Sequence, residues 1–155
     1  GYCLGGGMEV ALSTDFRICS EDSQLGIPAA RLSIAYSFDA IHRLCSLVGP
    51  SCAKDILITA RRIKAPEALR IGLVNQITSL AGLEEEVAEY TQAILENAPL
   101  SMQASKLTVD EILKNPADRN LAAIEEIGKT CFNSKDYREG RTAFMEKRKP
   151  VFTGK

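Results

Sequence analysis

The spacing of apolar residues changes near the middle of this 155-residue sequence, and the change limits the folds that it can adopt. In residues 1–79, short apolar runs alternate with glycine and proline, a pattern typical of short strands and helices. From residue 80 on, apolar residues recur every three or four positions, which is typical of amphipathic helices. The sequence therefore predicts an α/β part, residues 1–79, followed by a helical part, residues 80–155.

Glycine and proline mark the ends of the elements that we expect in the first part. The predicted helices cover residues 8–14, 40–48, 51–59 and 65–72, and the predicted strands cover residues 15–20, 23–28 and 73–77. Gly49-Pro50 separates the two middle helices as a stop and a restart. Gly72 is expected to end the last of these helices.

The helical part carries three apolar stripes and a last helix over residues 136–147. The stripes consist of Leu80, Leu83, Val87, Tyr90 and Ile94, of Met102, Ser105, Val109 and Ile112, and of Leu121, Ile124, Ile127 and Cys131. With few aromatic residues, these helices cannot bury every stripe on one another and still cover the first part. We expect them to pack against further protein or another subunit. A closed four-helix tail is the alternative.

Charge and cysteine content exclude several classes of protein. Nineteen basic and twenty acidic residues give no overall bias toward nucleic acid or anionic membranes. No apolar run approaches the ~20 residues that a membrane-spanning helix needs. The five cysteines and the single histidine have no zinc-site spacing, so we predict no metal. An odd, scattered set of cysteines suits a reducing compartment.

The run Gly5-Gly6-Gly7-Met8-Glu9 carries the main chemical signal. Glycines let another molecule approach the main chain closely. At the start of a helix they leave N–H groups without partners, and these can bind an anion or an oxygen that gains negative charge. The carbonyl of a thioester becomes such an oxygen when an enolate forms.

Two phosphate-binding loops do not fit the glycine triplet, and one structural interpretation of it remains. A Walker A loop needs a GK[ST] ending, which Gly7-Met8-Glu9 lacks, and the spacing of a dinucleotide-binding G-x-G-x-x-G also fails. The triplet could instead be only a tight turn from strand to helix, with Glu9 as the acidic third residue of the helix.

Read as a whole, three segments resemble one family. Residues 1–15, GYCLGGGMEVALSTD, closely resemble the segment G-x-x-x-G-G-G-x-E-[LV]-A-x-x-x-D of the enoyl-CoA hydratase/isomerase (crotonase) family. Residues 65–75, APEALRIGLVN, resemble its A-x-E-A-x-x-x-G-L-V, and residues 138–148, REGRTAFMEKR, resemble its closing E-G-x-x-A-F-x-E-K-R. Three motifs in the same order are much more specific than one.

The resemblance implies an α/β fold, in which the carboxy-terminal part of a ββα spiral core is followed by a helical trimerisation tail. Residues 1–79 would belong to the core and residues 80–155 to the tail. The chain starts without Met, as though cut within a domain, so we expect a fragment that lacks roughly a hundred residues of the core. We expect this fragment to be inactive alone. The implied assembly is a homotrimer or a hexamer.

The resemblance also implies roles for residues at the glycine triplet. Gly6 would donate one N–H to the thioester oxygen, flanked by Gly5 and Gly7 as substrate-binding residues, while the second donor would come from the absent half. Glu9 would orient and activate water as a general acid and base. Coenzyme A is part of the acyl-CoA substrate, so no separate cofactor is expected.

Two residues of the tail are placed by the same resemblance. Phe144 and Lys147 match positions near the coenzyme A of a neighbouring subunit, where Lys147 would meet a phosphate. The alternative for Lys147 is an ordinary surface lysine.

The sequence departs from the family at the second catalytic glutamate. The family's G-x-P-E segment is Gly26-Ile27-Pro28-Ala29 here, and Ala29, although expected at the substrate, cannot transfer a proton. The glycine-rich stretch P-G-x-G-G-x-x-R-L is altered to residues 36–44, YSFDAIHRL, where Tyr36 and Phe38 should reshape the acyl pocket.

Three residues of the altered stretch could supply the missing proton, as could a carboxylate outside the chain. Asp39 is close by, but Ser37 and Asp39 also suit helix capping. His42 falls inside the following helix beside Arg43, which is typical of an ordinary histidine. Tyr36 ranks last of the three.

The resemblance implies an enzyme that hydrates 2-enoyl-CoA in fatty-acid oxidation, and we expect it in the cytoplasm or the mitochondrial matrix. Because Ala29 removes one acid, the alternatives are double-bond isomerisation and decarboxylation of a malonyl-type thioester. A non-catalytic acyl-CoA-binding homologue remains a further alternative.

Overall fold

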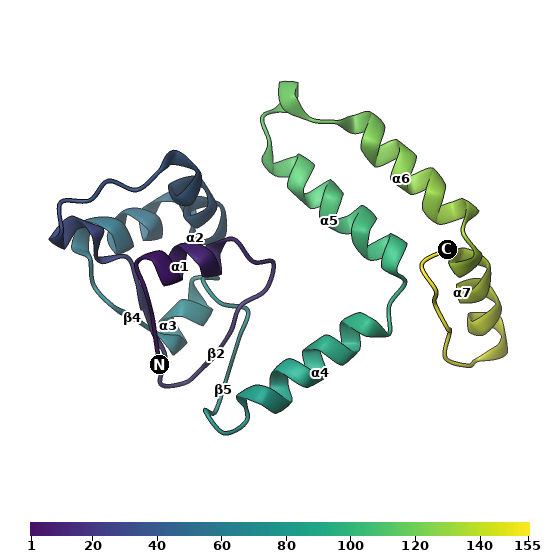
Figure 1. The fold of residues 1–155 in the computed structure, drawn as a ribbon, viewed down its shortest axis with the longest axis horizontal. Helices are drawn as coiled ribbons and strands as arrows, with labels where there is room; N and C mark the ends of the chain where they lie inside the picture. The colour runs from purple at the N-terminus through teal and green to yellow at the C-terminus, as the bar shows by residue number, and fades with distance from the viewer. The chain divides into compact units, whose positions relative to one another are not determined.

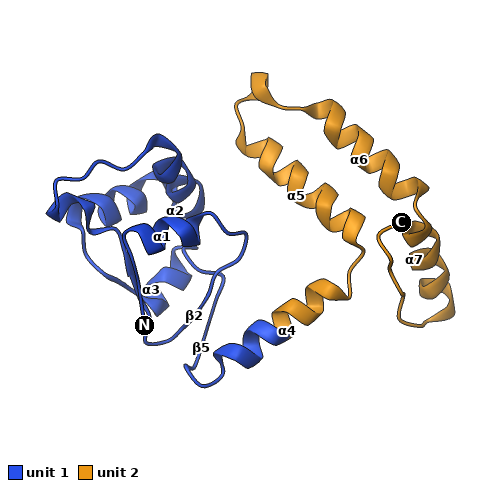
Figure 2. Ribbon diagram, viewed as in Figure 1, with its two compact units in different colours: residues 1–88 blue, residues 89–155 orange.

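The computed structural model describes all residues, 1–155, which form two compact units, residues 1–88 and 89–155 (Figures 1 and 2). None of the helices has the length and apolar character that crossing a membrane demands. The boundary that we predict after residue 79 separates the core from the tail. It is a different boundary from the one between the two compact units, which lies after residue 88, and it stays a prediction.

Unit 1 mixes short strands with helices, as the sequence predicts. Its elements are β1 (Tyr2–Leu4), α1 (Gly6–Leu12), β2 (Ile18–Ser20), β3 (Gln24–Gly26), the 3₁₀ helix η1 (Pro28–Arg31), α2 (Phe38–Thr59), β4 (Ile63–Lys64), α3 (Ala65–Arg70) and β5 (Gln76–Thr78). One sheet has the order β1-β3-β4, with β1 and β3 parallel and β4 antiparallel to β3. A second sheet pairs β2 and β5 in parallel.

The close packing of β3 fixes where α1 begins. Gly26 lies opposite Leu4 in the register of β1 and β3. A Cβ at Gly26 would lie 2.9 Å from the carbonyl oxygen of Arg61, so only glycine fits there. The carbonyl oxygen of Gly26 accepts a hydrogen bond from the N–H of Gly5, 3.0 Å away. Strand β3 therefore holds the residue from which α1 starts.

The apolar core of the chain lies in unit 1. Helices α1 and α2 and the strands contribute buried side chains that form one cluster. The cluster consists of Met8, Leu12, Leu25, Ile27, Ala29, Leu44, Ala53, Ile56, Ile63, Ala68, Leu73 and Val74. Because both α1 and α2 pack into it, their starts are held in position relative to each other.

The predicted break in α2 is confirmed. Gly49 has φ 75° and ψ 164°, which no helix accommodates, and Pro50 restarts the helix after it. The side chain of Ser37 caps the start of α2 by accepting a hydrogen bond from the N–H of Ala40 at 3.2 Å. The capping role that we weighed for Ser37 is therefore confirmed.

Some element bounds differ from the prediction. Helix α1 begins at Gly6 instead of Met8, because Gly5 alone, with φ +57°, makes the turn. The strand expected over residues 15–20 covers only Ile18–Ser20, since the N–H of Arg17 donates to the side-chain oxygen of Asn75 and the N–H of Asn75 donates to the carbonyl oxygen of Arg17. The strand after α3 begins late, at Gln76, for the same reason.

Helix α4 (Leu83–Leu95) runs from unit 1 into unit 2, whose regular elements are all helices, as predicted. The other helices of unit 2 are α5 (Pro99–Leu113), the 3₁₀ helix η2 (Pro116–Asp118), α6 (Leu121–Asn133) and α7 (Lys135–Glu146). Figure 1 shows α5 and α6 running side by side in opposite directions, joined through η2.

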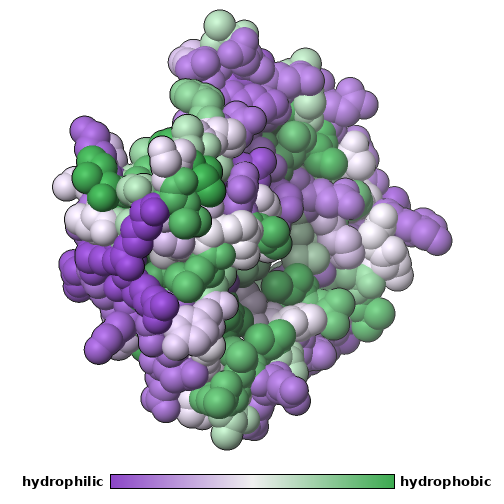
Figure 3. All heavy atoms as spheres, turned by 60° about the vertical axis from the view of Figure 1, so that its left-hand side comes forward, coloured by the Kyte–Doolittle hydropathy of each residue, from purple (hydrophilic) through white to green (hydrophobic).

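The helices of unit 2 bury very few apolar side chains. Helix α6 buries no residue and α5 buries only Glu111. Large apolar side chains stay exposed instead, namely Leu95, Val109, Ile112, Leu113, Leu121, Phe132, Phe144, Met145 and Val151. Figure 3, in which the left-hand side of Figure 1 is turned forward, shows hydrophobic residues among hydrophilic ones on the face it presents. The exposed apolar residues of unit 2 support the expectation that further protein packs against the tail.

Candidate active site

The start of α1 leaves backbone donors without partners. Gly5 precedes the helix with φ 57° and ψ −121°, and no side chain caps it. The N–H of Gly5 is bonded to Gly26, and the N–H of Glu9 to the carbonyl oxygen of Gly5 at 3.1 Å. The amides of Gly6 and Gly7 between them have no acceptor in the chain. They remain available to an oxygen of another molecule.

The space around these two amides is open. A Cβ added at Gly6 or Gly7 would meet no atom within 4 Å, so the protein does not crowd either glycine. Helix α1 has only seven residues, and its macrodipole is correspondingly small. What the geometry offers is therefore local: donors that a carbonyl oxygen could approach to about 2.9 Å.

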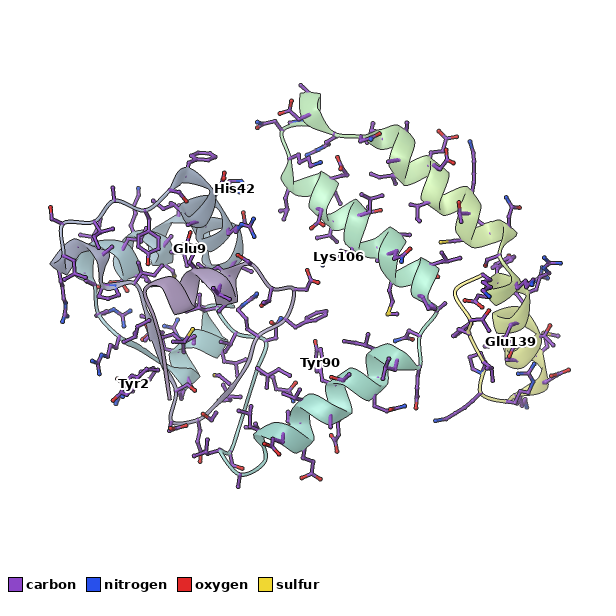
Figure 4. The ribbon with its side chains drawn as sticks, viewed as in Figure 1. Tyr2, Glu9, His42, Tyr90, Lys106 and Glu139 are labelled. Atoms are coloured by element: carbon purple, nitrogen blue, oxygen red, sulfur yellow. The ribbon has the colours of Figure 1, made fainter.

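Glu9 lies one helical turn after Gly5. Its side chain is exposed. Because side chains in a helix tilt toward the amino-terminal end, a side chain four positions after Gly5 leans back toward the start of α1. Glu9 is the fourth residue of α1, so the reading of Glu9 as the acidic third residue of a capped turn is wrong. Figure 4 shows Glu9 on α1 and His42 on α2.

Tyr36 reaches the same place from the loop before α2. Its half-buried ring packs against the apolar core cluster. Its hydroxyl oxygen lies 3.8 Å from the position that a Cβ of Gly5 would take. Burial raises the pKa of Tyr36, and the negative charge of Glu9 raises it further. The structure therefore brings together Gly5, Glu9 and Tyr36. Of the three proton sources that the altered stretch offers, Tyr36 was the one ranked last from the sequence.

The other residues of the altered stretch do not converge in this way. The ring of Phe38 is 80 % exposed and stacks on His42, with ring centroids 5.9 Å apart. Asp39 lies in the first turn of α2, where a carboxylate is favourable beside unpaired amides. The roles predicted for Phe38 in substrate binding and for Asp39 or His42 in proton transfer stay predictions.

Ala29 lies in η1 and is only 8 % exposed, as a member of the apolar core cluster. Its carbonyl oxygen accepts hydrogen bonds from the N–H groups of Leu32 and Ile34, at 3.0 and 3.1 Å. Its side chain carries no group that can move a proton. Its predicted place at the substrate stays a prediction.

Phe144 and Lys147 lie at the end of α7 in unit 2. The ring of Phe144 is 82 % exposed. Lys147 has φ 55° and ends the helix, with its N–H bonded to the carbonyl oxygen of Phe144 at 3.3 Å. Both residues are exposed. Their predicted contact with coenzyme A stays a prediction.

Two hollows in the surface lie away from the predicted site residues. One, of about 310 Å³, is lined by Asp55 of α2, Glu67 of α3 and Arg61 between α2 and β4, among others. The other, of about 550 Å³, lies in unit 2 and includes Lys129 and Ser134. Neither contains a predicted site residue. Because Glu9 is exposed on unit 1, the walls of an acyl pocket there would need protein from outside this unit.

Comparison with known proteins gives one consistent family. The model of the family described as "Enoyl-CoA hydratase/isomerase" matches residues 1–155. The chain is 40 % identical over 149 residues to a short-chain-enoyl-CoA hydratase of Clostridium acetobutylicum, covering 96 % of this chain and 57 % of the relative. It is 40 % identical over 155 residues to a crotonyl-CoA hydratase of Syntrophomonas wolfei, covering 100 % of this chain and 60 % of the relative.

Solved structures give the same result. The chain matches the crystal structure of an enoyl-CoA hydratase/carnithine racemase from Magnetospirillum magneticum with a TM-score of 0.92 and 32 % identity, over 100 % of this chain and 57 % of that one. An enoyl-CoA hydratase subunit from Geobacillus kaustophilus matches with a TM-score of 0.90 and 35 % identity, over 100 % and 60 % of the two chains. The predicted fold class is confirmed. The chain thus spans 57–60 % of the length of these relatives.

Proposed function

The chain belongs to the enoyl-CoA hydratase/isomerase family, and from this premise we propose that the whole protein acts on acyl-CoA thioesters by stabilising an enolate. One observation carries the proposal: the amides of Gly6 and Gly7 are unpaired at the start of α1, with the carboxylate of Glu9 one turn further on.

The stabilisation would come from the N–H of Gly6, flanked by Gly5 and Gly7. An enolate carries its negative charge on the former carbonyl oxygen, and a fixed N–H donor at that position stabilises the transition state by about 3 kcal/mol. The amide needs no reorganisation, because the turn at Gly5 already directs the start of the helix. The second donor that the family resemblance implies is not assigned to any residue of this chain.

The reaction that the relatives' names favour is hydration of a 2-enoyl-CoA. Glu9 would take a proton from water, whose oxygen then bonds to the β-carbon while the electrons of the double bond move into the enolate. The substrate class follows from relatives described as short-chain-enoyl-CoA and crotonyl-CoA hydratases.

The side chain of Ala29 favours a second candidate. Because that position carries no acid, a reaction that needs fewer proton transfers is open to the protein. Double-bond isomerisation or decarboxylation of a malonyl-type thioester would use the same donors at Gly6. A non-catalytic acyl-CoA-binding protein is the candidate from another class.

The assembly that we propose is a homotrimer or a hexamer in the cytoplasm or the mitochondrial matrix. The exposed apolar residues of α5 and α6 support the proposal, since burying them would stabilise the tail. Phe144 and Lys147 would then meet the coenzyme A of a neighbouring subunit.

Substitution of Glu9 by Gln in the full protein tests the proposal. We expect crotonyl-CoA hydration to fall by about 10²- to 10⁴-fold, because the amide keeps the shape but takes no proton. The measurement is the loss of the enoyl absorbance. Glu21→Gln, an equal change at an exposed residue of the same unit, is the control and should leave the rate unchanged. Equal rates for Glu9→Gln and the control would remove Glu9 from the mechanism.

A panel of thioesters separates the candidates. Hydration consumes the enoyl absorbance, decarboxylation of malonyl-type thioesters releases carbon dioxide, and a binding protein would bind coenzyme A thioesters without turnover. We predict that residues 1–155 alone are inactive, and measurable turnover by this fragment would contradict that.

A further inference from the structure

The hydroxyl of Tyr36 has no hydrogen-bond partner within the chain, although the ring that carries it is half-buried. Every buried polar side-chain atom of the molecule is bonded, so this hydroxyl faces open space. Its oxygen lies 3.8 Å from the position of an added Cβ at Gly5. The open space that it faces is therefore beside the start of α1.

The position of this hydroxyl is fixed by its surroundings. The ring of Tyr36 packs against the core cluster that also holds Met8 and Leu12 of α1. The next residue, Ser37, caps the start of α2. A tyrosine so anchored holds its hydroxyl in one place at low entropic cost, since only two side-chain torsions need to be fixed.

The charged group that acts on the hydroxyl is Glu9. Its negative charge and the burial of the ring both raise the pKa of Tyr36, so the hydroxyl stays protonated at neutral pH. A protonated donor, a carboxylate and an unpaired backbone N–H thus share the start of α1. No carboxylate is present at Ala29 to compete for this role.

We propose that Tyr36 is a catalytic residue that donates its hydroxyl proton to the α-carbon of the enolate, the step left without an acid by Ala29. The inference rests on the acyl-CoA chemistry proposed above for Gly6 and Glu9. It assigns to this chain both of the proton-transferring groups that hydration needs.

The protons balance over one cycle of hydration. Glu9 takes a proton from water, the water oxygen bonds to the β-carbon, and the electrons of the double bond form the enolate. The enolate re-forms its carbonyl while the α-carbon bonds to the proton of Tyr36, which becomes a phenolate. The protonated Glu9 then returns its proton to the phenolate. This transfer is downhill because a carboxylic acid is much the stronger acid.

Decarboxylation would use the same donor. Loss of carbon dioxide from a malonyl-type thioester leaves the same enolate, and the α-carbon again bonds to the proton of Tyr36. The phenolate then regains a proton from water. The role of Tyr36 therefore holds for whichever of these two reactions the full protein performs.

The test is Tyr36→Phe in the full protein, which removes the hydroxyl and keeps the ring in the core. Tyr2→Phe is the matched control, because Tyr2 is an exposed tyrosine of the same unit whose ring lies under Arg62. With crotonyl-CoA, or with a malonyl-type thioester if that is the substrate, we expect Tyr36→Phe to lower kcat by about 10²- to 10⁴-fold. KM should stay within about threefold, and the control should match the wild type.

A second measurement separates catalysis from structure. Exchange of the α-hydrogens of butyryl-CoA in deuterium oxide reports proton transfer at the α-carbon without any addition of water. We expect Tyr36→Phe to lose this exchange while its melting temperature is unchanged. A rise in KM with unchanged kcat, or undiminished exchange, would overturn the inference and leave the proposed function standing. Absence of turnover and exchange in the wild type would instead overturn the proposed function.

Discussion

Each of the two units of the chain is stabilised internally by a different kind of interaction. Unit 1, residues 1–88, contains all but one of the buried apolar residues, the exception being Ala143 of α7. In unit 2, residues 89–155, the buried polar residues are Glu111, Ser134 and Asp136, each in a hydrogen-bonded contact. Unit 1 is thus stabilised mainly by apolar burial and unit 2 by specific polar contacts.

The polar contacts of unit 2 tie helices and loops together at their ends. Glu111, near the end of α5, accepts hydrogen bonds from the N–H of Asn120, just before α6, and from Lys114, both at 2.7 Å. Asp136 accepts from the N–H groups of Thr153 and Gly154, at 2.8 and 2.7 Å, and so holds the carboxy-terminal segment against α7. Such contacts define a shape but bury little apolar surface, which explains why the apolar stripes remain open to a partner.

Deleting core volume in unit 1 should have the largest effect on stability. Leu44 is fully buried in the core cluster, so Leu44→Ala should lower the free energy of unfolding by about 2–5 kcal/mol. The matched change in unit 2 is Leu121→Ala, at a side chain that is 66 % exposed, with an expected loss of at most about 0.5 kcal/mol in the unassembled chain.

Denaturant unfolding of both variants measures this difference. A larger loss for Leu121→Ala in the assembled protein than in the dissociated one would indicate that another subunit covers α6. Equal losses of unfolding free energy for the two variants in the dissociated chain would contradict the conclusion that apolar burial stabilises unit 1 more than unit 2.

Removing one acceptor from Asp136 should loosen the end of unit 2. In Asp136→Asn only one side-chain oxygen can accept, so one of the two amides, Thr153 or Gly154, loses its partner. We expect that amide to exchange with solvent roughly tenfold faster, as measured by hydrogen exchange. Asp118→Asn, an exposed position in η2, is the control. Unchanged exchange at both amides would show that the segment is held by other contacts.

The smallest effect that we predict is a loss of stability of unit 2 at low pH. Arg148 and the N–H of Val151 bond the carboxylate of Glu139, labelled on α7 in Figure 4, and lower its pKa to about 2. Because the folded pKa lies below the ordinary value of 4.5, the contribution of Glu139 is complete above that value. It is lost as the pH falls through about 2.

An NMR titration of the Glu139 carboxyl carbon checks this pKa. Arg148→Met should move the midpoint toward the ordinary value, because the main donor is removed. An unshifted midpoint in the wild type would contradict the ion pair. Since the carboxylate is partly exposed, added salt should weaken the effect.

Part of the candidate site was proposed from the sequence alone, and its residues stay a prediction. The glycine triplet, Glu9 and the three family motifs are local patterns, and the matched family agrees with them. The convergence of Tyr36 on Gly5 and Glu9 was not predictable in this way. No local pattern reports that two segments separated by two strands and a 3₁₀ helix meet, because such contacts depend on how the core packs.

By itself, the sequence determined most of the helices, the break at Gly49 and the change to helices after residue 79, because periodicity and backbone restrictions act over a few residues. It did not reveal the short strands β1 and β4 or the two 3₁₀ helices. Only the tertiary structure decided that Gly5 alone makes the turn into α1, that Ala29 joins the apolar core, and that the hydroxyl of Tyr36 lies near Gly5. These outcomes depend on which distant surfaces pack together, and close packing of side chains is a property of the whole unit.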